Sequence, residues 1–454
     1  MKRDSIDLGK TNISSLFRIY FLPTLLGMLS MCVVTAIDGI FIGHGVGSEG
    51  VAAVNIAIAP MMLLVGLALM LGMGCSVVSS IHLSRGVFKT ARINVSQSIV
   101  TATVLVMLFY AIVYASPTRF AIALGASPTL LPYVLDYLLW LTPGVLFWIL
   151  TILGLFIVRL DGAPKLAMWF NIIPCILNAV LDYVFIFPLG MGLKGAAIAT
   201  AISEAVGGIL VIAYLGWFAR SLKLIKLKIS SKSLRLFARN IGYQSRIGVP
   251  ALLGEMSMAV IMFMGNQVFM RYLGDNGVGA FGIACYYCPF IFMIGNAIAQ
   301  SAQPIISFNF GIGQFDRVRQ TERLAIITAL VCGTIVTAMF VFMPRLMVSL
   351  FIAPDGEAAR IAIAGLPVFS VAVLCYIFNL TAIGYFQSVE RIAPSIIFAL
   401  LRGFVFVVPS FLLMPMILGT TGIWLALGIS EILTAASIIT FYFTRNRKGK
   451  LKTC

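Results

Sequence analysis

Long apolar stretches, separated by short polar or glycine- and proline-rich breaks, make up almost the whole chain. Each stretch holds about 20 residues or more, the length that an α-helix needs to cross a hydrocarbon core of ~30 Å. No strict alternation of polar and apolar residues, typical of outer-membrane barrel strands, runs through them. The pattern predicts an all-α polytopic membrane protein with twelve spans: 16–42, 51–80, 93–115, 130–158, 164–187, 194–218, 241–270, 277–307, 320–345, 358–387, 392–417 and 421–443.

The composition excludes several other classes of protein. Of 454 residues, 60% are apolar and 11% are charged, against about 25% charged in soluble domains. An ordinary soluble enzyme and a disordered chain are therefore excluded. Seven of the eight cysteines lie in apolar stretches, where small buried hydrophobic side chains are expected, and two histidines do not favour a zinc enzyme.

The distribution of the basic residues predicts the topology. With the N-terminus in the cytoplasm, 26 of the 32 lysines and arginines fall on or near the cytoplasmic side, 5 fall on or near the outside, and Arg402 alone lies in the middle of a span. Cytoplasmic loops carry the excess of basic residues in membrane proteins. We therefore expect both termini to be cytoplasmic.

The second half of the sequence repeats the first at an offset of 227 residues. Pro23–Met31 aligns with Pro250–Met258, and Ile202–Glu204 aligns with Ile429–Glu431. Two six-helix lobes follow, related by a pseudo-twofold axis along the membrane normal, as expected of an alternating-access transporter. The predicted divisions are an N-terminal lobe (1–218), a cytoplasmic basic linker (219–240), a C-terminal lobe (241–443) and a cytoplasmic basic tail (444–454).

A set of polar residues inside the first-lobe spans is a candidate functional site. A carboxylate in the bilayer costs roughly 2.5–3.5 kcal/mol, so each one requires a reason. Asn178 and Asp182 are one helical turn apart and share a face, and such side chains can hold a small cation or share a proton. The candidate set is Asp38, Asn178, Asp182 and Thr200, and the second repeat has lost all four. The site is therefore predicted to be confined to the N-terminal lobe.

Other ionisable residues inside spans leave more than one interpretation open. Glu204 lies one turn from Thr200, but both repeats keep this acid, which favours a structural role. Glu255 has no counterpart in the first repeat and is a candidate for substrate binding or a second coupling site. Arg402 is a candidate partner for a carboxylate. Glu204 and Arg402 are, like Glu255, also candidates for substrate binding or a second coupling site.

Several short motifs are spread over both halves of the chain. They are Pro23, Asp38-Gly-Ile-Phe-Ile-Gly43 with Gly47, Val51-Ala-Ala-Val-Asn55 with Pro60, Asn178-x-x-x-Asp182, Gly195-Ala-Ala-Ile-Ala-Thr200, Gly248-Val-Pro250, Gln303-Pro304 and Asn309-x-Gly311. Together these motifs resemble the multidrug and toxic compound extrusion (MATE) family over essentially all twelve spans. The segment 401–409 is similar to the bacterial MepA- and DinF-like branch.

The resemblance implies export of organic, often cationic, compounds driven by inward movement of H⁺ or Na⁺. In DinF-like members the cation site uses residues that match Asp38, Asn178, Asp182 and Thr200, which would hold Na⁺ in a Na⁺-coupled protein. Other members use acids in spans seven and ten; Glu255 lies in span seven, whereas span ten has no mid-span acid. We expect a functional monomer in the bacterial inner membrane, with small organic molecules and the lipid bilayer as partners and with no nucleic acid or cofactor besides the coupling ion.

Four other classes of protein fit the sequence less well. A major-facilitator transporter would carry a Gly-x-x-x-Asp-Arg-x-Gly-Arg-Arg loop after span two, where His82–Arg92 stands instead. A flippase for lipids or lipid-linked oligosaccharides shares the architecture and stays the alternative, although it would predict a more basic cavity. An intramembrane enzyme or an ATP-driven pump would need motifs such as His-Glu-x-x-His, Gly-x-Ser-x-Gly or a P-loop, which the sequence lacks.

Overall fold

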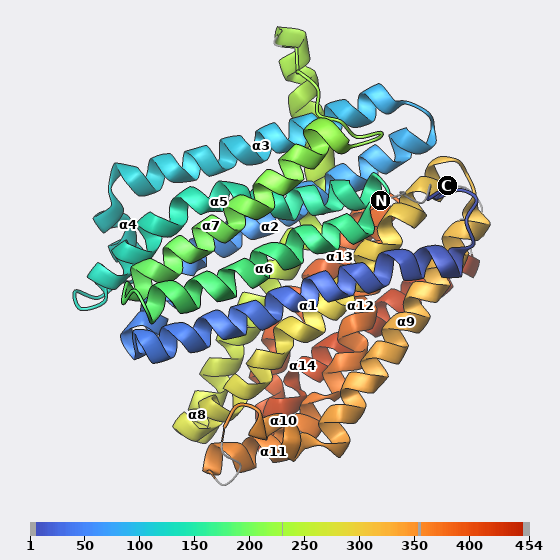
Figure 1. The fold of residues 1–454 in the computed structure, drawn as a ribbon. Coiled ribbons are helices and arrows are strands. Elements are labelled where there is room, and N and C mark those ends of the chain that lie inside the picture. The colour runs from blue at the N-terminus through green and yellow to red at the C-terminus, as the bar shows by residue number, and fades with distance from the viewer. Residues whose placement is uncertain (1–5, 229, 353–355, 448–454) are drawn as a thin grey trace. The chain divides into compact units, whose positions relative to one another are not determined.

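The computed structural model describes residues 6–228, 230–352 and 356–447, and the regular elements of these residues are helices (Figure 1). The first half contains α1 (Ile13–Gly45), α2 (Ser48–Ser84), α3 (Phe88–Ala115), α4 (Pro117–Ala123), α5 (Leu131–Leu160), α6 (Pro164–Ile186), α7 (Gly192–Ala213) and the π-helical turn η1 (Tyr214–Phe218). The second half contains α8 (Ser231–Gly311), α9 (Phe315–Phe342), α10 (Pro344–Ser349), α11 (Glu357–Phe369), α12 (Val371–Ser388), α13 (Ile392–Leu400), the π-helical turn η2 (Leu401–Val405) and α14 (Val407–Arg447).

The helices confirm the all-α, multi-pass architecture. Ten helical stretches in the described residues are long and apolar enough to cross a membrane. Two of them, Ser231–Gly311 and Ile392–Thr444, each hold two of the twelve predicted spans. These double stretches break at Gly274 (φ 62°) and Gly419 (φ 57°), which are repeat counterparts of turn glycines in the first half. Glycine adopts this left-handed conformation without the steric cost of a Cβ atom.

The helix that contains span seven begins earlier than the apolar pattern indicates. The predicted span starts at residue 241, but α8 starts at Ser231, within the predicted linker. The Ser230 hydroxyl accepts a hydrogen bond from the Ser233 amide (3.2 Å) and caps the helix. Residues 232–240 are mostly good helix formers, so the helix extends beyond its apolar part. The division into lobes, linker and tail stays a prediction, and the tail lies outside the described residues from 448 onward.

The described chain forms two compact units. The first contains residues up to 252 together with 307–315, and the second contains 253–306 together with the rest from 316. Within the first unit, α1 packs along α6, and α5 packs along both α2 and α7. Within the second unit, α12 packs along α14.

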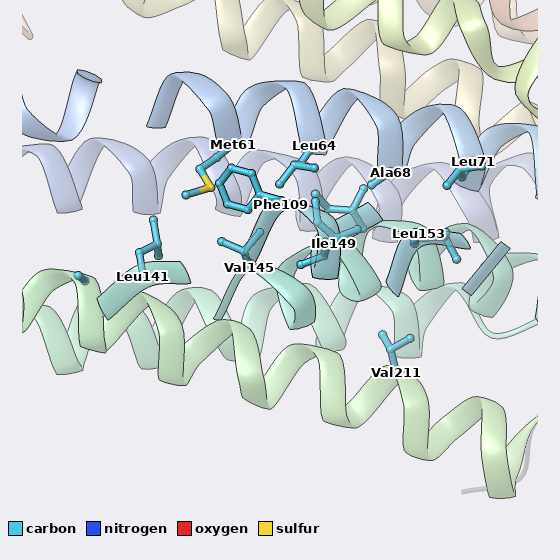
Figure 2. Close-up of a cluster of buried hydrophobic side chains, with 14 of the residues drawn as sticks. Met61, Leu64, Ala68, Leu71, Phe109, Leu141, Val145, Ile149, Leu153 and Val211 are labelled. Carbon is cyan, nitrogen blue, oxygen red and sulfur yellow. The ribbon is translucent and has the colours of Figure 1, made fainter. Parts of the chain in front are cut away.

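The core of the first unit is built from apolar side chains of α2, α3, α5 and α7 (Figure 2). Met61 and Leu64 of α2 lie against Phe109 of α3, and Val145 of α5 is fully buried among them. Small residues allow close helix contacts: a Cβ atom on Gly144 would lie only 2.5 Å from the Cα atom of Ala201. Such close backbone approach stabilises helix pairs in a membrane, where apolar surface alone does not drive association.

The first turns of α8 are fixed to the first unit by polar and backbone contacts. The Gln244 side-chain amide donates to Asn94 Oδ1 of α3 (2.8 Å), and the Ser98 hydroxyl of α3 donates to Gln244 Oε1. A Cβ atom on Gly74 would lie 1.9 Å from the Gln244 carbonyl oxygen, and one on Gly248 would lie 1.8 Å from the carbonyl oxygen of the facing α2 helix. This crossing therefore depends on two glycines, one in each helix.

The segment that precedes α8 is held by one carboxylate. Asp161, just after α5, accepts hydrogen bonds from the backbone N–H groups of Arg220, Ser221 and Leu222 and from the Tyr214 hydroxyl, all within 3.0 Å. These contacts fix the start of the basic segment against the end of α5.

Candidate cation site

Asp38 and Asp182 lie near each other on two packed helices of the first unit. Asp38 is in the second-last turn of α1, and Asp182 is in the last turns of α6 and is 0% exposed. Asn171 of α6 donates a hydrogen bond to the Gly27 carbonyl oxygen of α1 (2.9 Å), which joins the two helices. The two carboxyl groups are close enough to interact electrostatically. The structure therefore brings together two acids that are 144 residues apart in the sequence.

The two neutral members of the predicted set lie beside this pair. The Asn178 side-chain amide donates to the Thr200 hydroxyl of α7 (3.3 Å), and that hydroxyl donates to the Ala196 carbonyl oxygen (3.0 Å). Asn178 is one turn from Asp182 on α6, as the spacing predicts. The hydroxyl of Tyr137, on α5, interacts with Thr200 and with both acids. The four predicted residues thus gather at one place, and Tyr137 joins them from a fourth helix.

Three carboxylate oxygens of the site are buried without a hydrogen-bond donor among the described residues. They are Asp38 Oδ1 and both side-chain oxygens of Asp182. Buried polar atoms normally have a partner, and a buried unpaired charge is strongly unfavourable. A shared proton or a small cation would remove this imbalance. Carboxylate, amide and hydroxyl oxygens are hard donors that suit H⁺ or a hard ion such as Na⁺.

Glu204 lies one turn beyond Thr200 on α7 and is partly buried. The described residues give it no hydrogen bond and no cationic partner. It interacts electrostatically with the thiol of Cys175 on α6.

Arg402 and Glu431 form a buried ion pair in the second unit. Arg402 Nε lies 3.0 Å from Glu431 Oε1 and 3.3 Å from Oε2, and the two side chains are 3% and 0% exposed. The Asn379 amide donates to Glu431 Oε2 (2.7 Å) and to the Glu431 carbonyl oxygen (2.9 Å). The guanidinium lies over the Tyr376 ring, 4.0 Å from its centroid. Arg402 thus has a carboxylate partner, as expected, and that partner is in the last span.

The π-helical turn η2 places Arg402 in this position. A π-turn contains one extra residue per turn and changes which side chains face inward. The next residue, Gly403, approaches α8 closely, because a Cβ atom there would lie 2.6 Å from the Cβ atom of Ser257. Glu255, two residues before Ser257, makes no hydrogen bond or ion pair in the described part of the chain. The substrate or coupling roles predicted for Glu255 and Arg402 stay predictions.

Two tyrosines and an asparagine that lie beside these charged groups were not singled out from the sequence. Tyr137 and Tyr376 are aromatic residues in apolar stretches, where most such residues are packed against lipid or other helices. Asn379 is an amide inside span ten, which has no mid-span acid. A mid-span amide is itself a polar group that needs a partner, and this signal could have identified Asn379.

The sequence model of the MatE family matches the chain twice, over residues 23–184 and 250–412. The starts of the two matches are 227 residues apart, which is the offset of the internal repeat. Two repeated sets of membrane-spanning helices define a polytopic, two-lobe protein of the transporter class. The chain belongs to the MatE family.

Individual relatives match over nearly the full length. The multidrug export protein MepA of Staphylococcus haemolyticus (strain JCSC1435) is 25% identical over 443 residues, which cover 96% of this chain and 95% of the relative. MepA of Staphylococcus saprophyticus is 25% identical over 434 residues, with coverage of 94% and 93%. These relatives are exporters by name.

Solved structures show the same fold. An outward-facing multidrug resistance MATE transporter of the MOP superfamily superposes with a TM-score of 0.88 at 23% identity and 100% coverage of both chains. A variant of the Vibrio cholerae MATE transporter VcmN superposes with a TM-score of 0.84 at 20% identity, with coverage of 96% and 97%. At these identities the likeness establishes the fold alone, and it confirms the predicted two-lobe, twelve-span architecture.

Proposed function

We propose that this chain is a secondary active exporter of organic, often cationic, compounds that exchanges them for H⁺ or Na⁺ by alternating access. The observation that carries the proposal is the set of three buried carboxylate oxygens of Asp38 and Asp182 without a hydrogen-bond donor. A group that must gain and lose a cation is expected to lack a permanent partner. Membership of the MatE family and the named export function of the MepA relatives support the same conclusion.

The coupling step follows from the geometry of the site. Two nearby buried carboxylates cannot both keep a full charge at low cost, so binding of one cation stabilises the pair. Asn178 and Thr200 lie alongside and offer oxygens to the same cation. Asp38 and Asp182 belong to different helices, α1 and α6. Binding of a cation relieves the repulsion between their carboxylates and therefore favours closer packing of those two helices. In the proposed cycle, the cation enters from outside and favours the state that releases the organic compound.

The energy available depends on the charge of the exported compound. One inward charge that crosses ~150 mV releases about 3.5 kcal/mol. For a neutral compound, at about 1.4 kcal/mol per tenfold change, this sustains a substrate gradient of roughly 300-fold. For a monovalent organic cation, one-for-one exchange moves no net charge, so the concentration gradient of H⁺ or Na⁺, or a second coupling ion, must supply the energy.

The proposal includes location and orientation. The chain would lie in the bacterial cytoplasmic membrane as a functional monomer with both termini in the cytoplasm, because 26 of its 32 basic residues then face the cytoplasm. No cofactor other than the coupling ion is proposed. A flippase would need an unpaired positive charge to hold a phosphate, and the charge of Arg402 is paired with Glu431, so the drug exporter is favoured.

The test is efflux of a fluorescent organic cation from vesicles that contain the purified protein. One arm imposes a Na⁺ gradient at equal pH, and the other imposes a pH gradient without Na⁺. We expect one gradient to drive efflux, and Asp182→Asn to abolish it. Asp136→Asn makes the same change at an exposed carboxylate of α5 and should transport like the parent. Efflux that neither gradient drives would contradict the antiport mechanism.

A further inference from the structure

Both repeats carry a glutamate at the same position, but the surroundings of the two glutamates differ. The offset of 227 residues places Glu204 on Glu431 and Cys175 on Arg402. In the second unit this pair of positions is a buried salt bridge, with 3.0 Å between Arg402 Nε and Glu431 Oε1. In the first unit the position of the arginine holds a neutral thiol, and the glutamate has no cation beside it. The same acid is therefore neutralised in one repeat and left able to bind a cation in the other.

Contacts between α6 and α7 place Glu204 next to Cys175. The two helices are consecutive and antiparallel. One contact joins Asn178 to Thr200 at 3.3 Å. A second is the close approach of Gly207 to Pro174, where a Cβ atom on Gly207 would lie 2.9 Å from Pro174 Cγ. Glu204 lies between these two contacts, at the level of Cys175.

The position of Glu204 extends the acid site along the helix axis. α7 runs from Gly192 toward the end of the bundle that holds Asp161, which is the cytoplasmic end in the proposed topology. Four residues of helix advance about 6 Å, so Glu204 is roughly 6 Å nearer that end than Thr200. The Asp38–Asp182 pair lies on the opposite side of Thr200, toward the end of α6.

We propose that Glu204 is a second proton-binding residue of the first repeat, which accepts the proton that leaves the Asp38–Asp182 pair on its way to the cytoplasm. In this step a carboxylic acid of the pair passes its proton, through bridging water, to the Glu204 carboxylate. The pair is left charged and Glu204 becomes neutral. The inference rests on the proposed function with H⁺ as the coupling ion.

The surroundings of Glu204 suit this role. Among the described residues, the titratable group that interacts with Glu204 is the thiol of Cys175 on α6. Cys32 of α1 interacts with that thiol, Tyr137 of α5 interacts with Thr200, and Ser30 of α1 lies 3.9 Å from the Cys175 sulfur. None of these side chains is basic. No fixed cation therefore holds Glu204 in its charged form, in contrast to Glu431.

The test compares Glu204→Gln with the parent in vesicles with an imposed pH gradient. Glu204→Gln should lower uphill export of an organic cation by at least about tenfold, which corresponds to 1.4 kcal/mol, and should flatten its pH profile. Exchange of labelled for unlabelled substrate without a gradient should stay within about twofold of the parent, because the substrate path is intact. Glu204→Asp keeps a carboxylate and should keep the pH dependence.

Thermal stability separates a coupling role from a structural one. Glu204→Gln should melt at or above the parent temperature, because an unpaired carboxylate is removed from a partly buried place. Cys175→Arg would give the first repeat the ion pair of the second and should reproduce the loss of pH-driven export, whereas Cys175→Ser should not.

Three results would overturn the inference. They are a Glu204→Gln variant with the pH profile and uphill export of the parent, a Glu204→Gln variant whose stability collapses, and a parent driven by Na⁺ alone. A parent that no ion gradient drives would instead contradict the proposed function, so the two failures are distinguishable.

Discussion

Removal of one partner from the Arg402–Glu431 pair should destabilise the second unit strongly. In Glu431→Gln the carboxylate that faces Arg402 is lost, and a guanidinium that is 3% exposed would stay charged without a counter-ion. The loss of one member of a buried ion pair typically costs about 3–5 kcal/mol. For a folding unit of about 200 residues, at roughly 2–4 °C per kcal/mol, the melting temperature should fall by about 6–20 °C.

Replacement of both partners should restore most of this loss. Arg402→Met together with Glu431→Met removes both charges and keeps unbranched side chains of comparable length. Apolar replacement of a whole buried pair is often neutral or stabilising. The double variant should therefore melt near the parent temperature, which makes the two substitutions strongly non-additive.

The assay is thermal denaturation in detergent, followed by the amount of monodisperse protein after heating. Glu357→Gln is the matched control, since it makes the same change at an exposed glutamate near the start of α11 and should shift the midpoint by less than about 2 °C. A Glu431→Gln variant that melts with the parent, or a double variant that is as unstable as the single one, would contradict a stabilising buried ion pair.

Three further outcomes are expected. Gly248→Val should abolish transport while the protein still reaches the membrane, because a Cβ atom at this position would lie 1.8 Å from a backbone oxygen of α2. The control is Gly242→Ala, whose Cβ atom would meet nothing within 4 Å and which should be active. Transport by Gly248→Val would contradict a required contact between α2 and α8. In a cysteine-free background, a cysteine at Lys226 should react only with a cytoplasmic reagent and one at Leu189 only with an external reagent, and the reverse pattern would refute the topology. Asp161→Ala removes the acceptor of four hydrogen bonds. Tryptic cleavage in the basic segment before α8 should therefore be several-fold faster than in the parent, as measured on gels. An unchanged cleavage rate would show that other contacts hold the segment.

The sequence alone predicted most of the fold because a membrane imposes strong and simple constraints. A span needs about 20 apolar residues, and each turn is marked by glycine, proline or charge. The repeat was visible because glycines, prolines and acids recur at one offset, and the two family matches confirm it. The start of α8 was misplaced, since hydropathy records where a helix is apolar and gives no signal for its polar continuation from Ser231.

The sequence identified the four residues of the candidate site but did not identify the residues that contact them. Asp38 and Asp182 were identified because a carboxylate in an apolar stretch is costly and must have a purpose. Tyr137 was not, because its phenol is one of many aromatic groups in apolar stretches and only its neighbours distinguish it. A partner supplied by another helix leaves no mark in the local sequence.

The amino-acid sequence by itself determined the number of spans, the internal repeat and the residues whose burial is expensive, because these depend on the solvent that surrounds each helix. The tertiary structure decided which of those residues meet. It paired Arg402 with Glu431 across 29 residues of chain, and it left Asp38 and Asp182 side by side without a donor. The physical reason is that a hydrogen bond or ion pair forms only over a few ångströms, and such proximity is set by helix packing.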